Sequence, residues 1–134
     1  MGRTLSIDYG EKRIGIAVSD PLNLTAQALK YLENKLGVYV LIKQLVNELS
    51  VSKILVGLPK NREGKDTKKS LEIKEFAKEL VHFVESEIEF RDERYSTVAV
   101  NKHLIAADVS RKKRREIVDS QAAAFILQGY LDSL

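Results

Sequence analysis

The chain has 134 residues, 44% of them hydrophobic, and a formal net charge of +3. This size and composition suit a single globular domain that buries most of its apolar surface, and so small a net charge says little about partners. The absence of cysteine excludes disulfides, thiolate nucleophiles and sulfur-based zinc sites, and it is compatible with a reducing, cytoplasmic compartment. No segment approaches the roughly 20 apolar residues that cross a bilayer, so we expect a soluble protein without a membrane partner.

Alternating side chains in the first third predict three β-strands, at residues 3–9, 13–19 and 26–31. In the second strand, branched aliphatic side chains from Ile14 to Val18 share one face, whereas the other face carries small side chains. Short connections between successive strands are typical of an antiparallel meander. The three strands are therefore expected to pair in chain order.

In the middle of the chain, apolar residues recur at spacings of three and four over residues 37–49, which predicts an amphipathic helix. The continuous apolar run over residues 53–59 is typical of a buried parallel strand. A polar surface loop is expected at residues 60–66, and helical spacing returns over residues 71–84. Residues 87–91 predict a fifth strand.

The last third is predicted to be helical. Ser96 or Thr97 can cap a helix that runs towards Ala107, and Ser110 precedes a long helix over residues 111–134. The resulting order, three strands followed by helices and strands in alternation, predicts an α/β fold. Its sheet would be five-stranded and mixed, with the first three strands antiparallel and helices on its faces.

Carboxylates lie at or near the ends of several predicted elements. Asp8 ends the first strand, Asp92 and Glu93 follow the fifth, and Asp119 lies in the final helix. Aspartate is depleted in strands and is almost never buried alone, so Asp8 is expected to meet a cation, a hydrogen-bond donor or a metal ion. Functional groups of open α/β sheets gather beyond the carboxyl ends of the strands, and small alanines at 122–124 would let the last helix approach Asp8.

Clustered carboxylates repel one another unless a hard cation lies between them. Two Mg²⁺ or Mn²⁺ ions about 3.5–4 Å apart are the usual solution where a phosphodiester is hydrolysed. One ion activates the attacking water and the other stabilises the leaving oxygen. Taken singly, each acid has a simpler explanation. Asp8 can be a turn residue, Glu93 can pair with a neighbouring arginine, and Asp119 can be a surface acid of its helix.

Basic residues stand beside these acids and before the last helix. Arg13 and Arg94 could bind phosphates, although structural pairing of these arginines explains them equally well. Five consecutive cations suit a polyanion such as nucleic acid, with a solvated helix start as the equal alternative. They are Arg111, Lys112, Lys113, Arg114 and Arg115.

Four blocks of the chain carry a recognisable pattern. They are Ile7-Asp8-Tyr9-Gly10 with Arg13-Ile14-Gly15-Ile16-Ala17, Val56-Gly57-Leu58-Pro59, Asp92-Glu93-Arg94-Tyr95-Ser96-Thr97, and Asp119 with Ala122-Ala123 and Ile126-Leu127-Gln128. In this order they resemble the YqgF family of Holliday junction resolvases, over essentially the whole chain. The resemblance implies one ribonuclease H-like nuclease domain over residues 1–134 and chemistry with divalent Mg²⁺ or Mn²⁺. It also implies a bacterial cytoplasmic enzyme that matures the 5′ end of the 16S ribosomal RNA precursor.

Carried over position by position, the resemblance makes Asp8, Glu93 and Asp119 the catalytic, metal-binding acids. In the wider resolvase superfamily the second acid commonly ends the fourth strand. Here that place holds Gly57-Leu58-Pro59, which has no carboxylate. The second ligand is therefore expected from Asp92 or Glu93, with Glu93 favoured.

Other functions stay open at this point. The chain could resolve four-way DNA junctions, or it could bind nucleic acid without cleaving it. A symmetric resolvase would need a two-fold homodimer, whereas an enzyme that trims RNA could be a monomer. The sequence distinguishes neither RNA from DNA nor an endonuclease from an exonuclease. An Asp-x-Gly start also opens actin-like and sugar-kinase ATPases, but these need two such domains, and only one fits in 134 residues.

Overall fold

The computed structural model describes residues 2–59, 65–92 and 111–134, with side chains of the last range described from Ser120 onward. The elements follow the predicted order of strands and helices. They are β1 (Arg3–Asp8), β2 (Arg13–Ser19), β3 (Ala26–Glu33), α1 (Val38–Glu48), β4 (Val51–Leu58), α2 (Lys68–Leu80), β5 (Glu87–Asp92) and α4 (Arg111–Asp132). The helix expected between Ser96 and Ala107 lies outside the described residues.

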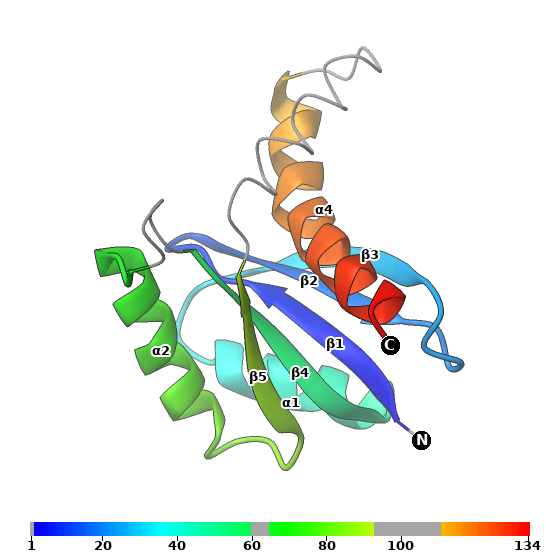
Figure 1. Ribbon diagram of the computed structural model, residues 1–134. Helices are drawn as coiled ribbons and strands as arrows, with labels where there is room; N and C mark the ends of the chain where they lie inside the picture. Colours follow the sequence, from blue (N-terminus) through cyan, green and yellow to red (C-terminus); the bar gives the residue numbers. More distant parts are fainter. Residues whose placement is uncertain (1, 60–64, 93–110) are drawn as a thin grey trace.

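The five strands form one mixed sheet in the order β3-β2-β1-β4-β5. β2 is antiparallel to both β1 and β3, whereas β4 is parallel to both β1 and β5. The prediction of a mixed sheet with three antiparallel strands first is therefore confirmed. Because β1, β4 and β5 run in the same direction, their carboxyl ends meet at one edge of the sheet (Figure 1).

The two faces of the sheet are covered by different helices. α1 and α2 lie on one face, and α4 crosses β3, β2 and β1 on the other (Figure 1). The face towards α1 and α2 is built from large aliphatic side chains of alternate strand positions. Fully buried members are Leu5, Ile7, Ile14, Ile16, Ile54 and Val56.

The face under α4 is built from small side chains. Ala17 of β2 is fully buried there together with Ala123 of α4, and the smaller core also includes Leu55, Ala124, Leu127 and Leu131. Small residues on both surfaces let a helix pack close to a sheet, as the alanines at 122–124 predicted. Among the described ranges, no helix is long and apolar enough to cross a membrane.

Several boundaries differ from the prediction: β3 extends to Glu33 rather than ending at residue 31, α2 ends at Leu80 rather than at residue 84, and two elements begin earlier than expected. β4 begins at Val51 rather than at residue 53, because Val51 is buried and pairs with Arg3 of the parallel strand β1. α2 begins at Lys68, three residues before its first apolar position, because Thr67 caps it. Such helix boundaries depend on caps that a periodic pattern does not contain.

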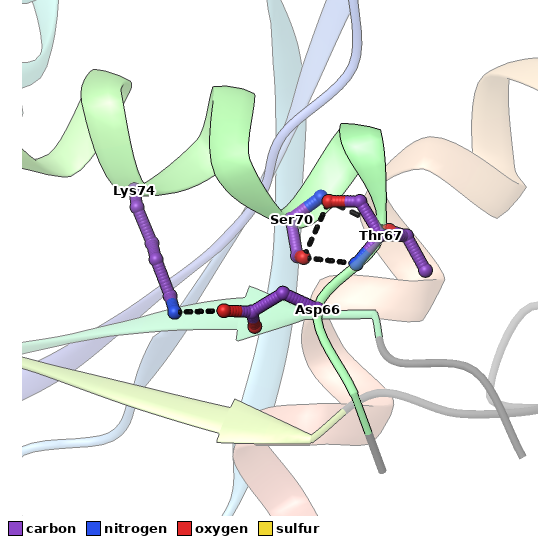
Figure 2. A network of polar contacts seen from close by, with 4 residues as sticks. All are labelled: Asp66, Thr67, Ser70 and Lys74. Carbon is purple, nitrogen blue, oxygen red and sulfur yellow. Dashed lines mark hydrogen bonds and ion pairs between the residues drawn. The ribbon is translucent and has the colours of Figure 1, made fainter. Parts of the chain in front are cut away.

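The cap of α2 is a reciprocal pair of hydrogen bonds (Figure 2). The backbone N–H of Ser70 donates to Thr67 Oγ1 at 3.1 Å, and the backbone N–H of Thr67 donates to Ser70 Oγ at 2.6 Å. Lys74, one turn further on, forms an ion pair with Asp66 at 2.6 Å. A capping interaction of this kind is worth about 1 kcal/mol, so the first turn of α2 is held firmly in place.

Candidate functional site

Asp8 lies at the edge of the sheet where the parallel strands end. It is the last residue of β1 and is half-buried. Leu5 and Ile7 point into the core under α1 and α2, so the alternation of the strand places Ser6 and Asp8 on the face that α4 covers. The predicted position of a carboxylate at the end of an apolar strand is confirmed.

The strand register sets the neighbours of Asp8 on this face. Ile7 pairs with Val56 of β4, so Asp8 lies level with Gly57, the next residue of β4. Gly57 in turn pairs with Arg91 of β5. Since Gly57 has no side chain, nothing on β4 at this level separates Asp8 from β5. The end of β4, where the sequence has no carboxylate, thus contributes no side chain between Asp8 and β5.

The turn that follows Asp8 is tightly packed. A Cβ atom on Gly10 would lie 2.5 Å from the carbonyl oxygen of Arg13, a separation that real Cβ atoms essentially never show. The carbonyl of Gly10 accepts a hydrogen bond from Asn34 Nδ2 at 2.8 Å, which ties the turn to the end of β3. Close packing of the backbone therefore explains Gly10, and it fixes the end of β1 that carries Asp8.

The backbone of Asp119 belongs to α4, the helix that covers the face of Asp8. Ser120, the next residue, is buried and donates a hydrogen bond to the carbonyl of Leu29 in β3. Ala123, one turn later, packs on the sheet. These contacts anchor α4 directly after Asp119.

The remaining predicted residues fall at or beyond the limits of the described structure. Glu93 and Arg94 lie outside the described residues, directly after the end of β5. The five cations from Arg111 to Arg115 form the start of α4, and their side chains, like that of Asp119, lie outside the described set. Among the side chains that are described, no three His, Asp or Glu residues lie together as a metal site.

Arg13 has a structural partner. Its guanidinium lies 5.2 Å from the centroid of the Tyr31 ring on β3, within the range of a cation–π interaction. This contact supports the structural explanation of Arg13 that the sequence left open. Arg13 also lines a cavity beside the β1–β2 turn, so contact with a phosphate is compatible with the same position.

A second group of basic side chains surrounds Tyr130 near the end of α4. Lys53 Nζ of β4 donates a hydrogen bond to Tyr130 Oη at 3.0 Å, and this bond raises the pKa of Lys53. Lys53 Nζ lies 5.1 Å from the centroid of the Tyr130 ring, and the guanidinium of Arg91 lies 5.3 Å from it. Arg91 of β5 therefore points to the α4 side of the sheet.

Sequence reasoning missed the cations around the cavity beside the turn. The cavity has a volume of about 730 Å³ and is lined by residues 9–13 together with Lys68, Lys69 and Glu72 of α2. Lys12, Lys68 and Lys69 carried no motif. The signal that could have found the two lysines of α2 is the helix start at Thr67, since a cap there places them in the first turn.

Comparisons with known proteins agree with this fold. A model of the RuvX family, described as a Holliday junction resolvase, matches residues 2–133. A relative from Clostridium botulinum (strain Hall), named "Putative pre-16S rRNA nuclease", is 44% identical over 134 residues that cover 98% of each chain. A relative of the same name from Halalkalibacterium halodurans is 47% identical and covers 97% of this chain and 96% of its own.

Solved structures show the same fold at low sequence identity. T. thermophilus RuvC in complex with a Holliday junction substrate aligns with a TM-score of 0.60 at 11% identity, covering 99% of this chain and 95% of that one. The fowlpox virus resolvase bound to Holliday junction DNA aligns with a TM-score of 0.57 at 13% identity, covering 98% and 97%. The predicted ribonuclease H-like fold is confirmed.

Proposed function

The chain belongs to the RuvX (YqgF) family of Holliday junction resolvases, and from this premise we propose that it is a divalent-metal-dependent nuclease. Its substrate is structured RNA, and its task is to mature the 5′ end of the 16S ribosomal RNA precursor. Residues 1–134 form one nuclease domain that acts in the cytoplasm, a location that suits a chain without cysteine. The observation that carries the proposal is the position of Asp8. It is a half-buried carboxylate at the carboxyl edge of the sheet, on the face covered by the helix that contains Asp119.

The acids are suited to hold two Mg²⁺ or Mn²⁺ ions. Carboxylate oxygens are the ligands that these hard cations prefer. An α-helix repeats every 3.6 residues, so position 119 shares a helix face with position 123, which packs on the sheet. This spacing supports a site that Asp119 shares with Asp8. When bound, the two ions supply an activated water and stabilisation of the leaving oxygen.

The strand alternation of β5 favours Glu93 over Asp92 as the second acid. Arg91 points to the α4 side of the sheet, where its guanidinium lies over Tyr130. Asp92, the next residue of the strand, therefore belongs to the opposite face. Asp92 is therefore disfavoured as a ligand beside Asp8, which supports Glu93 as the second acid.

Within this site, residues of the chain position the substrate around the acids. The close packing of the turn at Gly10 fixes the backbone position of Asp8 at the end of β1. Arg94 and the five cations from Arg111 to Arg115 supply charge for the phosphates of the substrate, and Arg13 adds a further cation from its place over Tyr31. Their contribution to binding weakens as salt is added.

A cleavage assay tests the proposal. A fragment that contains the 5′ end of the 16S precursor is incubated with the chain in Mg²⁺, in Mn²⁺ and in a chelator. We expect metal-dependent cleavage that falls by roughly 100-fold or more in Asp8→Asn, Glu93→Gln and Asp119→Asn. Asp132→Asn, the same change near the end of α4, serves as the matched control and should cleave like the native chain. Equal cleavage by the native chain and Asp8→Asn would overturn the proposal.

One further variant and a second substrate sharpen the outcome. Asp92→Asn should retain most activity if Glu93 is the ligand, and a reversed result would assign that role to Asp92. A four-way DNA junction tests the second candidate, which the description of the matching family favours. Symmetric cuts in the junction by a homodimer, with no cleavage of the RNA, would make the chain a resolvase. Binding of either substrate without cleavage would make it a non-catalytic module.

A further inference from the structure

A cavity lies next to the proposed active site, on its α2 side. It has a volume of about 730 Å³, within the usual range of about 300–1,000 Å³ for ligand sites. One wall is the turn of residues 9–13, which follows Asp8 directly, and the other is the first turn of α2. The cavity thus begins at the residue after Asp8 and extends towards α2.

The lining of the cavity is positively charged. Lys12, Lys68 and Lys69 are exposed, and Arg13 adds a fourth cation against two acids, Glu11 and Glu72. Within the described part of the chain, the ion pairs do not involve the three lysines. By contrast, Lys74 of the same helix is paired with Asp66 at 2.6 Å. The charge of the three lysines is therefore available to a ligand.

The walls of the cavity are also held in place. Thr67 and Ser70 form the capping box that fixes the helix turn of Lys68 and Lys69 (Figure 2). On the opposite wall, the ring of Tyr9 packs against Phe76 of α2 with 4.7 Å between ring centroids. Since Tyr9 directly follows Asp8, this contact connects the edge of the active site to α2.

We infer that this cavity binds phosphate groups of the RNA strand adjacent to the bond that is cut, with Lys68 and Lys69 on one side and Lys12 on the other. The inference rests on the proposed nuclease function, because the position beside Asp8 is what identifies a nucleic-acid strand as the occupant. Ammonium groups bind phosphates as point charges, without reading the bases. The cavity thus adds affinity and direction to the strand rather than sequence specificity.

Binding is tested with the Asp8→Asn chain, which holds the RNA without cutting it. Fluorescence anisotropy measures the Kd for the 5′ precursor fragment at several salt concentrations. Lys68→Gln with Lys69→Gln should weaken binding by about three- to tenfold at moderate salt, and it should lower the salt slope by about 0.7 for each lost contact. The matched control, Lys43→Gln with Lys78→Gln, removes the same charge from exposed positions of α1 and α2 away from this cavity.

The outcomes separate this inference from the proposed function. If both double variants weaken binding equally, only the net charge matters and the inference is overturned. If the native chain cuts the RNA but the lysines of α2 leave binding unchanged, the cavity assignment fails alone. If the native chain cuts neither substrate while the lysines still control RNA binding, the nuclease proposal fails, and the cavity is a phosphate site for RNA without a cut bond beside it. Polyglutamate serves as a competing ligand. If it binds more tightly than RNA, and if this binding depends on the same lysines, the cavity belongs to an acidic protein and the inference is overturned.

Discussion

Replacing Gly10 by alanine tests how rigidly the chain holds Asp8. The new Cβ would lie 2.5 Å from the carbonyl oxygen of Arg13, about 0.9 Å inside the 3.4 Å at which ordinary contacts begin. The atom in the way is backbone, and the same turn is tied to β3 through the hydrogen bond from Asn34. The turn must therefore open by most of an ångström. Steric strain of this kind costs about 1–3 kcal/mol of unfolding free energy.

The same displacement should reach the active site. Asp8 is two residues from Gly10, and a shift of about 1 Å in a reacting group can cost about 100-fold in rate. Gly10→Ala is thus expected to unfold at lower urea concentration and to cleave RNA about 10- to 100-fold more slowly per folded molecule.

Gly129→Ala is the matched control. Gly129 lies in α4, where a new Cβ would meet no neighbouring atom within 4 Å. The variant should therefore have a free energy of unfolding about 0.5–1 kcal/mol higher than the native chain, and it should cleave RNA at the native rate. Native stability and native cleavage in Gly10→Ala would refute the reasoning. A loss of stability without any loss of rate would show that the turn does not position Asp8.

Three further predictions concern the face under α4 and the β2–β3 turn. The hydroxyl of Ser6 is buried and has no hydrogen-bond partner in the described structure. Ser6→Ala should therefore raise the free energy of unfolding, measured in urea, by up to about 1 kcal/mol. A decrease of more than about 1 kcal/mol would contradict this. Ala123 is fully buried where α4 meets the sheet, so Ala123→Leu should lower the free energy of unfolding by about 1–3 kcal/mol and remove most of the cleavage rate. Gln121→Leu, at an exposed position of α4, should keep native stability and native cleavage. The backbone N–H groups of Thr25 and Leu24 donate to the Asp20 carboxylate and lower its pKa. The native chain should therefore be more stable than Asp20→Asn above about pH 4, and this difference should vanish as the pH falls through the lowered pKa. A stability difference that persists at lower pH would refute this origin.

The order of the elements could be predicted because most of it is local. Alternation in β1 and β2, the helical spacing of α1 and the continuous apolar run of β4 each result from burial on one face or on both. The start of β4 could not be predicted, since Val51 becomes part of a strand through its pairing with Arg3, which is remote in sequence. The cap of α2 was missed because its third helical position is Ser70, where the usual signature has Glu or Gln.

The candidate site was predictable where one residue conflicts with its surroundings. Asp8 is a charged residue at the end of an apolar strand. The buried alanines of α4 stand at core positions where larger apolar residues are usual. The cavity beside Asp8 could not be predicted in this way. Lys12 and Lys68 are ordinary surface lysines in sequence, and only the parallel pairing of β1 and β4 brings the β1–β2 turn to the start of α2.

The central claim is that Asp8, Glu93 and Asp119 share divalent ions. The most direct test is a crystal of the native chain soaked with Mn²⁺ and measured for anomalous diffraction. We predict anomalous peaks within about 2.5 Å of Asp8 carboxylate oxygens that also contact Glu93 or Asp119. Mn²⁺ bound elsewhere, or Asp8 without a peak while Asp119 points away from it, would contradict the account.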